Sequence, residues 1–572
     1  MVKRTALLLL LTFWLAPSLR FVSAQDVQRP RTTTTAATSS NLPARAAADA
    51  PRSLDELKSR IEQIVRQPAL EPGFFAVKIV SLDSAAVIYE QDANKFVRPA
   101  SNMKLYTVAT AFDRLTPDFR FITSVYAKEK PDDGKVKGDL VIYGRGDPSI
   151  AARFNDGDYF KGINELADRI LVAGVRRVKG DLVGDESYFN GAPLGSGWEW
   201  EDLTWSYGAP VSALNINDNA LDLNVKPADR VGAPVLVTTG PPAASFVTIV
   251  NRATTSARGS RSNLRIYRGL GANTIELSGT LPFGDAGFVG GVAIQDPALA
   301  FVTMLRDALV KRGVKIDGRV RTVNWRSGGS VVPAANEGEA TALPAPIEIA
   351  SLQSPPFSAI ASHTLKPSQN QYTELILRTL GRTQPSLVSE NGRTRDDEDA
   401  GLEIVRNFLR QAGIGDNDVA LNDGSGLSRN DLISANTTVA LLTFMTKHKY
   451  FAQFRDALPI AGVDGTLREL AKRPQVYVKL SEVLRLVDGK PSTDPALYKP
   501  TLDYLFDMFG EDRVIFGSDW PNSFAADNLP AIVKIVKDYF STKSRAAAEK
   551  YFWKNSVAAY KWVKRDPKQP QA

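Results

Sequence analysis

The chain has 572 residues, no cysteine and only two histidines, and its 70 Lys and Arg residues exceed its 63 Asp and Glu residues to give a net charge of +7. The length predicts roughly three or four domains, and 43% apolar with 23% charged residues is typical of a folded globular protein. Lack of cysteine excludes disulfides, thiolate metal sites and cysteine nucleophiles, and no basic run with interleaved aromatic residues favours nucleic-acid binding.

The first 24 residues are predicted to be a secretory signal peptide. A basic start at Lys3 and Arg4 precedes an apolar run over 6–16 and small residues up to Ala24. The run is shorter than the roughly 20 apolar residues of a membrane span. We therefore expect cleavage after Ala24, export to the periplasm or cell envelope, and no stable transmembrane anchor. Residues 25–52 are rich in Thr, Ala, Pro and Ser and are predicted to be a disordered linker.

A helix, a pair of strands and a long β-rich stretch are predicted next along the chain. Ser53 is a typical N-cap for an amphipathic helix. Strand-like runs follow over 75–80 and 86–89. Residues 120–345 contain short strands, many glycines and turn dipeptides. Helical periodicity returns over 372–380, 400–411 and 435–447.

One hexapeptide occurs twice in the β-rich stretch. The sequence Val-Lys-Gly-Asp-Leu-Val stands at Val136–Val141 and at Val178–Val183, and Lys315–Val320 is a looser echo of it. These copies predict turn-then-strand units. Two or three copies are too few for a solenoid.

Ser101 and Lys104 form a Ser-x-x-Lys pair at the start of an apolar, helix-like run. The preceding Phe96–Ala100 reads as an apolar strand and a proline turn, which places the serine at the mouth of the helix. Lys104 then lies one turn on, where its amine can reach the hydroxyl. A desolvated amine can take the proton of a serine and make it a nucleophile. The alternative is an N-cap serine beside a solvated lysine. This alternative is favoured when the Ser-x-x-Lys pair is taken alone, because serine is a common N-cap residue.

Ser368 and Asn370 put a hydroxyl and an amide on one side of a loop that leads into a helix. The hydroxyl can relay a proton to a leaving group, and the amide can hold a peptide carbonyl. The alternative is a simple polar turn with a helix cap. A third segment, Asn422–Arg429, has glycines that suit a tight loop.

These three segments, in this order, resemble the low-molecular-mass penicillin-binding proteins of the serine D-Ala-D-Ala carboxypeptidase and endopeptidase family (S13, DacB type). The resemblance implies an α/β (α+β) serine β-lactamase/transpeptidase-like domain, formed by 53–119 and 346–470, with 120–345 as β-rich inserted domains. It spans about 53–468 and includes these further segments: Gly138–Val141, Gly144–Pro148, Tyr207–Leu214 and Leu458–Leu467.

The resemblance implies an acyl-serine mechanism without a cofactor or a metal. Ser101 would be the acylated nucleophile and Lys104 its base, with Ser368 and Asn370 as the second element of the active site. The expected substrates are peptidoglycan stem peptides, and β-lactams are expected to acylate the same serine. Asp202 and Tyr207 are expected to line the substrate groove.

The third motif of the family, Lys-Thr-Gly on an edge strand, does not occur in this sequence. In the family its lysine attracts the substrate carboxylate, and its small residues let the strand pair with the substrate. Lys479 is the nearest substitute, but Leu480 and Ser481 replace the threonine and glycine. The alternative to an active enzyme is therefore a catalytically weak or inactive wall-binding protein, or the product of a gene fusion.

The C-terminal residues 471–572 have a different likeness. Pro474–Ser481 and Phe509–Pro521 resemble the end of amidohydrolase-related TIM-barrel hydrolases, over about 474–560. A whole barrel needs about 250 residues, so we expect a partial α/β barrel fragment. Asp519 would take the metal or water-activating role, but the tail has no histidine, which disfavours a metal-dependent amidohydrolase. A gene fusion or an assembly error in the parent genome would both produce such a join.

Overall fold

The computed structural model describes residues 53–67, 73–242, 246–327, 346–383, 395–459, 477–480, 485–487, 490–492, 495–516 and 529–556. The chain divides into two compact units, one including Gly73–Leu458 and the other including Ala36–Pro72 and Pro459–Ala572. The predicted signal peptide and linker lie outside the described residues. Within the described ranges, no helix is both long and apolar enough to cross a bilayer.

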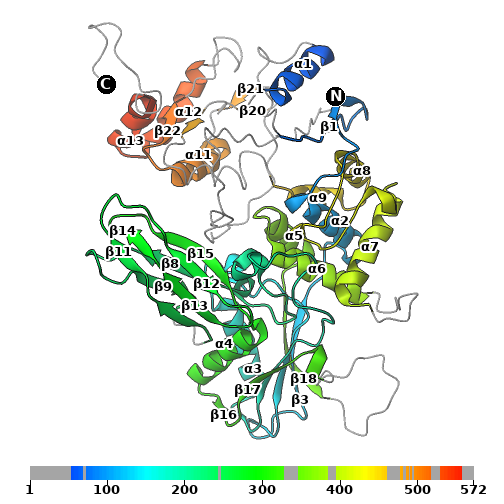
Figure 1. The fold of residues 1–572 in the computed structure, drawn as a ribbon, viewed down its shortest axis with the longest axis vertical. Helices are drawn as coiled ribbons and strands as arrows, with labels where there is room; N and C mark the ends of the chain where they lie inside the picture. The colour runs from blue at the N-terminus through cyan, green and yellow to red at the C-terminus, as the bar shows by residue number, and fades with distance from the viewer. Residues whose placement is uncertain are drawn as a thin grey trace. The chain divides into compact units, whose positions relative to one another are not determined.

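A group of helices forms one part of the larger unit (Figure 1). Phe112 of the central helix α2 makes edge-to-face contacts with Phe357 and Phe454, in a core of fully buried apolar side chains. The predicted helices over 372–380, 400–411 and 435–447 are confirmed. The helices are α2 (Met103–Leu115), α5 (Phe357–Leu365), α6 (Asn370–Thr383), α7 (Asp397–Gln411), α8 (Ala435–Met445) and α9 (Phe451–Ala457).

The two predicted strands near the start of this unit form a two-stranded antiparallel sheet. They are β1 (Val77–Val80) and β2 (Val87–Gln91). The expectation of a strand before Ser101 is wrong, because Val97 makes only an isolated bridge with Ile433. Within the described residues this sheet has no third strand.

A five-stranded mixed sheet, in the order β17-β7-β5-β3-β18, carries the second core of the larger unit. Two amphipathic helices pack on it, and these were not predicted within the β-rich stretch. The elements are β3 (Ile122–Ala127), β5 (Leu140–Tyr143), β7 (Leu182–Asp185), β17 (Val320–Val323), β18 (Ile347–Gln353), α3 (Lys161–Val172) and α4 (Pro297–Lys311).

The repeated hexapeptide forms the predicted turn-then-strand units. Each copy gives a two-residue strand and then a strand of the five-stranded sheet, and equivalent strands pair in parallel. The Asp139 carboxylate accepts the Asp181 N–H at 2.8 Å, and Asp181 accepts the Arg319 N–H at 2.8 Å. The aspartate of one copy thus holds the backbone of the next. The short strands are β4 (Lys135–Val136), β6 (Arg177–Val178) and β16 (Lys315–Ile316).

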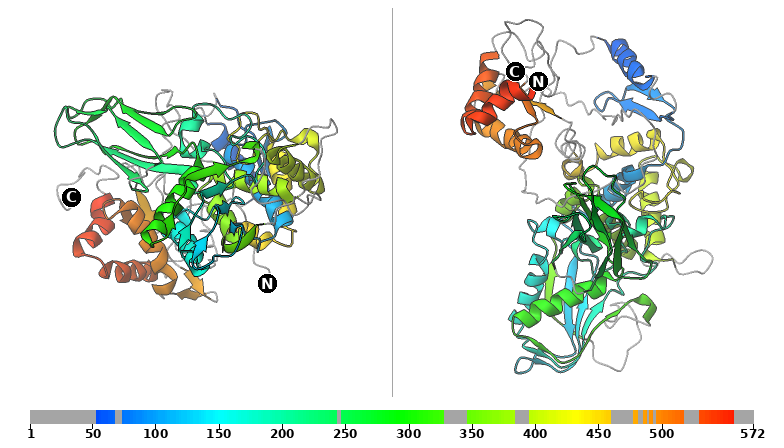
Figure 2. Two further views of the ribbon diagram at one scale, coloured as in Figure 1. Left: turned by 90° about the horizontal axis from the view of Figure 1, so that it is seen from below. Right: turned by 60° about the vertical axis from the view of Figure 1, so that its left-hand side comes forward.

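Residues 220–293 form a third part of the larger unit, drawn in green in Figures 1 and 2. Three small sheets share one apolar core that contains Leu223, Ile275 and Leu281. Their strands are β8 (Ala220–Lys226), β9 (Leu236–Gly240), β10 (Thr248–Asn251), β11 (Thr254–Ser256), β12 (Arg265–Arg268), β13 (Thr274–Ser278), β14 (Thr280–Pro282) and β15 (Phe288–Ala293).

The smaller unit is a helical cluster with short strands. The helix predicted at Ser53 is α1 (Leu54–Val65), and the Ser53 hydroxyl caps it by accepting the Glu56 N–H. The strands are β19 (Val478–Leu480), which pairs in parallel with β22 (Val514–Phe516), and β20 (Arg485–Val487) with β21 (Lys490–Ser492). The C-terminal helices are α11 (Pro495–Phe509), α12 (Leu529–Ser541), α13 (Arg545–Glu549) and a π-helix, η10 (Lys550–Lys554).

Candidate active site

Ser101 and Lys104 lie together where a short 3₁₀ turn, η2 (Ala100–Asn102), runs into α2. Lys104 is 1% exposed, and its amine donates a hydrogen bond to the Ser101 hydroxyl at 3.2 Å. Ser101 itself is exposed. Asn102 rather than Ser101 occupies the N-cap of α2, and no side chain caps the helix there. The Ser101 hydroxyl therefore faces the lysine and is not used to cap the helix.

Ser368 completes a chain of three polar groups. Its hydroxyl donates to the Ser101 hydroxyl at 2.7 Å across 267 residues of sequence. Ser368 has a left-handed φ of 60°, which a serine rarely adopts. Neighbouring Lys366 donates to the Leu458 carbonyl at 3.0 Å, which ties this loop to the end of α9. The segment of Ser101 and Lys104 and the segment of Ser368 thus meet at the Ser101 hydroxyl.

Asn370 begins α6, and its amide donates to the Tyr207 carbonyl at 3.0 Å. Tyr207 lies in the 3₁₀ turn η5 (Ser206–Gly208), directly after η4 (Asp202–Thr204). Burial raises the pKa of Asp202, whose carboxylate accepts the Glu199 N–H at 3.2 Å. Burial and the neighbouring Asp202 raise the pKa of Tyr207. The structure therefore places Asp202 and Tyr207 beside the loop of Ser368 and Asn370.

The loop over Asn422–Ser428 lies against the start of α2, at Lys104 and Thr107. The Ser425 carbonyl accepts a hydrogen bond from the Lys104 amine at 2.8 Å. The Gly424 carbonyl accepts one from the Thr107 hydroxyl at 2.9 Å. The sequence singled out this segment as a tight loop but gave it no role, because a backbone carbonyl carries no residue-type signal.

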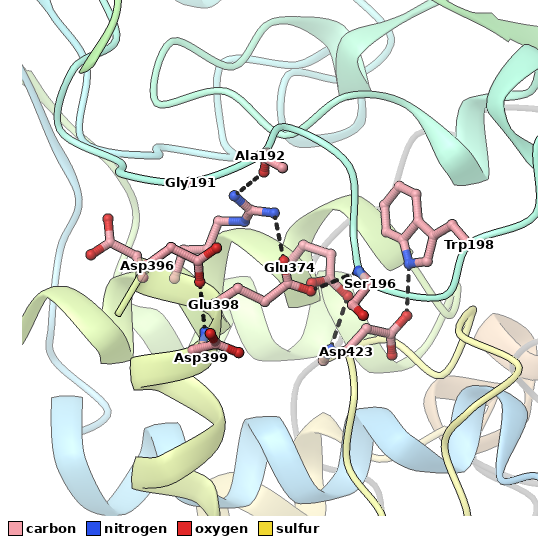
Figure 3. Close-up of polar contacts among 12 residues, drawn as sticks. Gly191, Ala192, Ser196, Trp198, Glu374, Asp396, Glu398, Asp399 and Asp423 are labelled. Atoms are coloured by element: carbon pink, nitrogen blue, oxygen red, sulfur yellow. Dashed lines mark hydrogen bonds and ion pairs between the residues drawn. The ribbon is translucent and has the colours of Figure 1, made fainter. Parts of the chain in front are cut away.

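The side chains of Glu374, Glu398 and Asp423 form a group of buried carboxyl groups at this loop (Figure 3). Glu374 accepts the Gly424 N–H at 3.0 Å, and burial together with nearby Asp423 raises the pKa of Glu374. Burial raises the pKa of Glu398 to about 7, although Arg378 lies 3.2 Å away. Sequence analysis missed this group, because its members come from separate helices and loops.

Two further predicted residues belong to the smaller unit. Lys479 lies on β19 opposite Ile515 of the parallel strand β22. Asp519 lies outside the described residues.

Most of the chain matches one protein family. Residues 57–481 match the D-Ala-D-Ala carboxypeptidase 3 (S13) family. The D-alanyl-D-alanine carboxypeptidase of Actinomadura sp. is 32% identical over 425 residues, which are 72% of this chain and 73% of that protein. D-alanyl-D-alanine carboxypeptidase DacB of Haemophilus influenzae is 25% identical over 69% of this chain and 75% of its own length.

A solved structure has the same fold. Penicillin binding protein 4 (dacB) from Haemophilus influenzae superposes with a TM-score of 0.56, over 68% of this chain and 79% of that chain, at 23% identity. The fold of the larger unit is thus the mixed α/β fold of that protein, as the sequence predicted.

The C-terminal end matches a second family. Residues 457–562 match the Amidohydrolase family. The L-fucono-1,5-lactonase of Burkholderia multivorans is 32% identical over 107 residues, which are 18% of this chain and 36% of that protein. The chain therefore contains a segment similar to about a third of the lactonase, as the sequence likeness indicated.

Proposed function

The chain belongs to the D-Ala-D-Ala carboxypeptidase 3 (S13) family, and we propose that it cleaves D-Ala-D-Ala peptides through an acyl-enzyme at Ser101. The hydrogen-bonded chain of the Lys104 amine, the Ser101 hydroxyl and the Ser368 hydroxyl carries this proposal. If Ser101 capped the helix, its hydroxyl would face the helix backbone and the Lys104 amine would lie in water. Instead Lys104 is buried against the serine.

The reaction has two halves. Lys104 takes the hydroxyl proton of Ser101 while the serine oxygen bonds to the carbonyl carbon of the penultimate D-alanine. Backbone N–H groups, including that of Ser101, hold the oxyanion. The carbon–nitrogen bond then breaks, and the Lys104 proton reaches the leaving amine through the Ser368 hydroxyl. In the second half a water gives a proton to Lys104 while its oxygen bonds to the acyl carbon. The ester bond between that carbon and the Ser101 oxygen then breaks, and the proton on Lys104 returns to the Ser101 oxygen.

The neighbouring polar groups are proposed to hold the peptide. The Asn370 amide, which donates to the Tyr207 carbonyl in this structure, would bind a peptide carbonyl of the substrate. Asp202 and Tyr207 would line the groove beside it. Lys479, on the strand β19 that pairs with β22, would bind the terminal carboxylate of the substrate.

The proposed substrates are peptidoglycan stem peptides, which end in D-Ala-D-Ala, in the cell envelope. The proposed signal peptide over residues 1–24 would export the chain there. The Haemophilus influenzae protein was also solved complexed with a novel β-lactam. We propose that β-lactams acylate Ser101 here, because they present a strained amide to the same nucleophile.

A second function is favoured by one observation. The sequence has no Lys-Thr-Gly, so the binding of the substrate carboxylate lacks its usual group. Loss of one such contact in the transition state costs several kcal/mol at most. A wall-binding protein with slow turnover, encoded by a gene fusion, fits this observation.

A fluorescent penicillin separates the two functions. The full chain is incubated with the probe, and the fraction labelled is followed in time for wild type and for Ser101→Ala. Ser53→Ala is the matched control, because Ser53 also stands at the start of a helix. We expect labelling of wild type and Ser53→Ala and none of Ser101→Ala. Absence of serine-dependent labelling would contradict the acyl-enzyme function.

A further inference from the structure

The backbone of the loop Asn422–Ser428 contacts the proposed base Lys104 and the residue that precedes the proposed nucleophile Ser101. The Ser425 carbonyl accepts from the Lys104 amine at 2.8 Å. Gly426 has φ +78° and lies so close to the Ala100 carbonyl that a Cβ would overlap it. Ala100 directly precedes the nucleophile Ser101. The loop therefore sets the position of the amine and of the backbone that carries the hydroxyl.

One carboxylate holds this loop in shape. Asp423 is fully buried and accepts five hydrogen bonds. Three come from the backbone N–H groups of Ser425, Gly426 and Ser428, at 3.1, 2.6 and 2.9 Å. A fourth comes from the Ser425 hydroxyl at 3.1 Å, and the fifth from the Trp198 indole at 2.8 Å. Both oxygens of the carboxylate are used.

The carboxyl groups of Glu374 and Asp431 also accept hydrogen bonds from the loop. Glu374 accepts the Gly424 N–H, and Asp431 accepts the N–H groups of Asn422 and Asp423, at 2.6 and 3.4 Å. Asp423 alone among these three binds the residues on both sides of the Ser425 carbonyl. Its loss would release the peptide groups that face Lys104 and Ala100.

We propose that Asp423 is a positioning residue for the acylation step, which it supports by fixing the Ser425 carbonyl against Lys104 and Gly426 against Ala100. This inference rests on the proposed function of Ser101. The fixed carbonyl takes one N–H of the amine and so directs the rest of the amine toward the Ser101 hydroxyl. A displacement of about 1 Å in such a group costs about 100-fold in rate.

The test is Asp423→Asn in the full chain, with the acylation of Ser101 by a penicillin followed by rapid mixing. An amide has one oxygen, so its nitrogen would face N–H donors and the loop would shift. We expect the acylation rate constant to fall about 100-fold, while the dissociation constant of the noncovalent complex changes less than about threefold. Labelling at completion stays at one probe per chain.

Two further variants separate positioning from folding. Asp147→Asn is the matched control, because Asp147 is also a buried carboxylate, and it accepts only from Ser149. We expect its acylation rate constant to stay within about twofold of wild type. Trp198→Phe removes one of the five donors, and we expect a loss of about three- to tenfold.

The outcomes distinguish failure of the inference from failure of the function. If Asp423→Asn lowers only the labelled fraction, or leaves the rate constant within threefold of wild type, Asp423 has no positioning role. If wild type itself is not labelled, the acyl-enzyme function fails, and crystal structures of both chains decide the inference. In that case the inference requires that the hydrogen bond from the Lys104 amine to the Ser425 carbonyl, 2.8 Å in wild type, is broken in Asp423→Asn.

Discussion

The proposed nucleophile of this protein and the strand expected to bind its substrate differ sharply in how the structure holds them in place. Ser101 and Lys104 are fixed by contacts with Ser368 and Ser425, which lie hundreds of residues further along the chain. The sheet of β1 and β2 has only two strands within the described residues, and Val87 is 41% exposed. Lys479 lies instead on a strand paired with β22.

This difference teaches that bond making and substrate binding are separable in the fold. The groups that transfer the proton are held by buried hydrogen bonds from helices and one loop. The carboxylate contact depends on an edge strand, and two-stranded sheets are only marginally stable by themselves. We therefore expect a penicillin to acylate Ser101 at a normal rate once bound, but to bind weakly. Each prediction below perturbs one side of this comparison.

The largest effect is expected for Lys104→Met. Methionine keeps the volume of the buried side chain but cannot accept the proton of Ser101. General-base catalysis contributes about 10²- to 10⁴-fold, so we expect the acylation rate constant for a penicillin to fall about 10³-fold. Lys161→Met is the control, because Lys161 also begins a helix, α3, but is exposed. Acylation of Lys104→Met at the wild-type rate would show that another group is the base.

The next effect concerns the backbone contact behind the nucleophile. Gly426 and Gly413 have the same φ of +78°, but only Gly426 lies against another chain segment, at Ala100. Alanine at Gly413 should cost about 1 kcal/mol, the price of a left-handed residue. Alanine at Gly426 adds a steric overlap, and we expect about 3 kcal/mol or more.

Urea unfolding of both alanine variants measures this difference directly, and penicillin labelling measures its consequence for Ser101. Labelling should slow at least tenfold for Gly426→Ala and remain unchanged for Gly413→Ala. Equal losses of stability in the two variants would show that the close approach in the structure contributes nothing, and that φ alone matters.

The two sides of the comparison also differ in what the sequence could predict. Ser101 and Lys104 are three residues apart, so helix geometry alone brings them together. Trp198 and Asp423 are 225 residues apart, and no local pattern indicates that they meet. Helices α3 and α4 were missed because short strands and glycines surround them. The repeated hexapeptides predicted turn-then-strand units because equal sequences tend to form equal units, but their parallel pairing was not predicted.

A smaller effect is expected from the buried carboxyl group of Glu398, which accepts the Ser196 N–H and pairs with Arg378. Burial raises the pKa of Glu398 from 4.5 to about 7. The folded protein thus keeps a proton that the unfolded chain releases above about pH 4.5, so the stability from this group is lost as pH rises from 4.5 to 7. Glu398→Gln removes this dependence.

The measurement is urea unfolding at several pH values. The free energy of unfolding of wild type relative to Glu398→Gln should fall by about 1–3 kcal/mol between pH 4.5 and pH 8. Glu165→Gln, on the exposed face of α3, serves as the control and should follow the wild-type curve. A constant difference between wild type and Glu398→Gln would mean that Glu398 is ionised throughout.

The smallest effect is expected from restoring the missing motif. Leu480→Thr combined with Ser481→Gly recreates Lys-Thr-Gly from Lys479 onward. Because the backbone of β19 is paired in register with β22, new side chains there leave that pairing unchanged. We expect the dissociation constant for a penicillin and the acylation rate constant at Ser101 both to stay within about twofold of the parent chain. A tenfold gain in penicillin affinity, lost again on Lys479→Met, would instead show that Lys479 contributes to binding at Ser101.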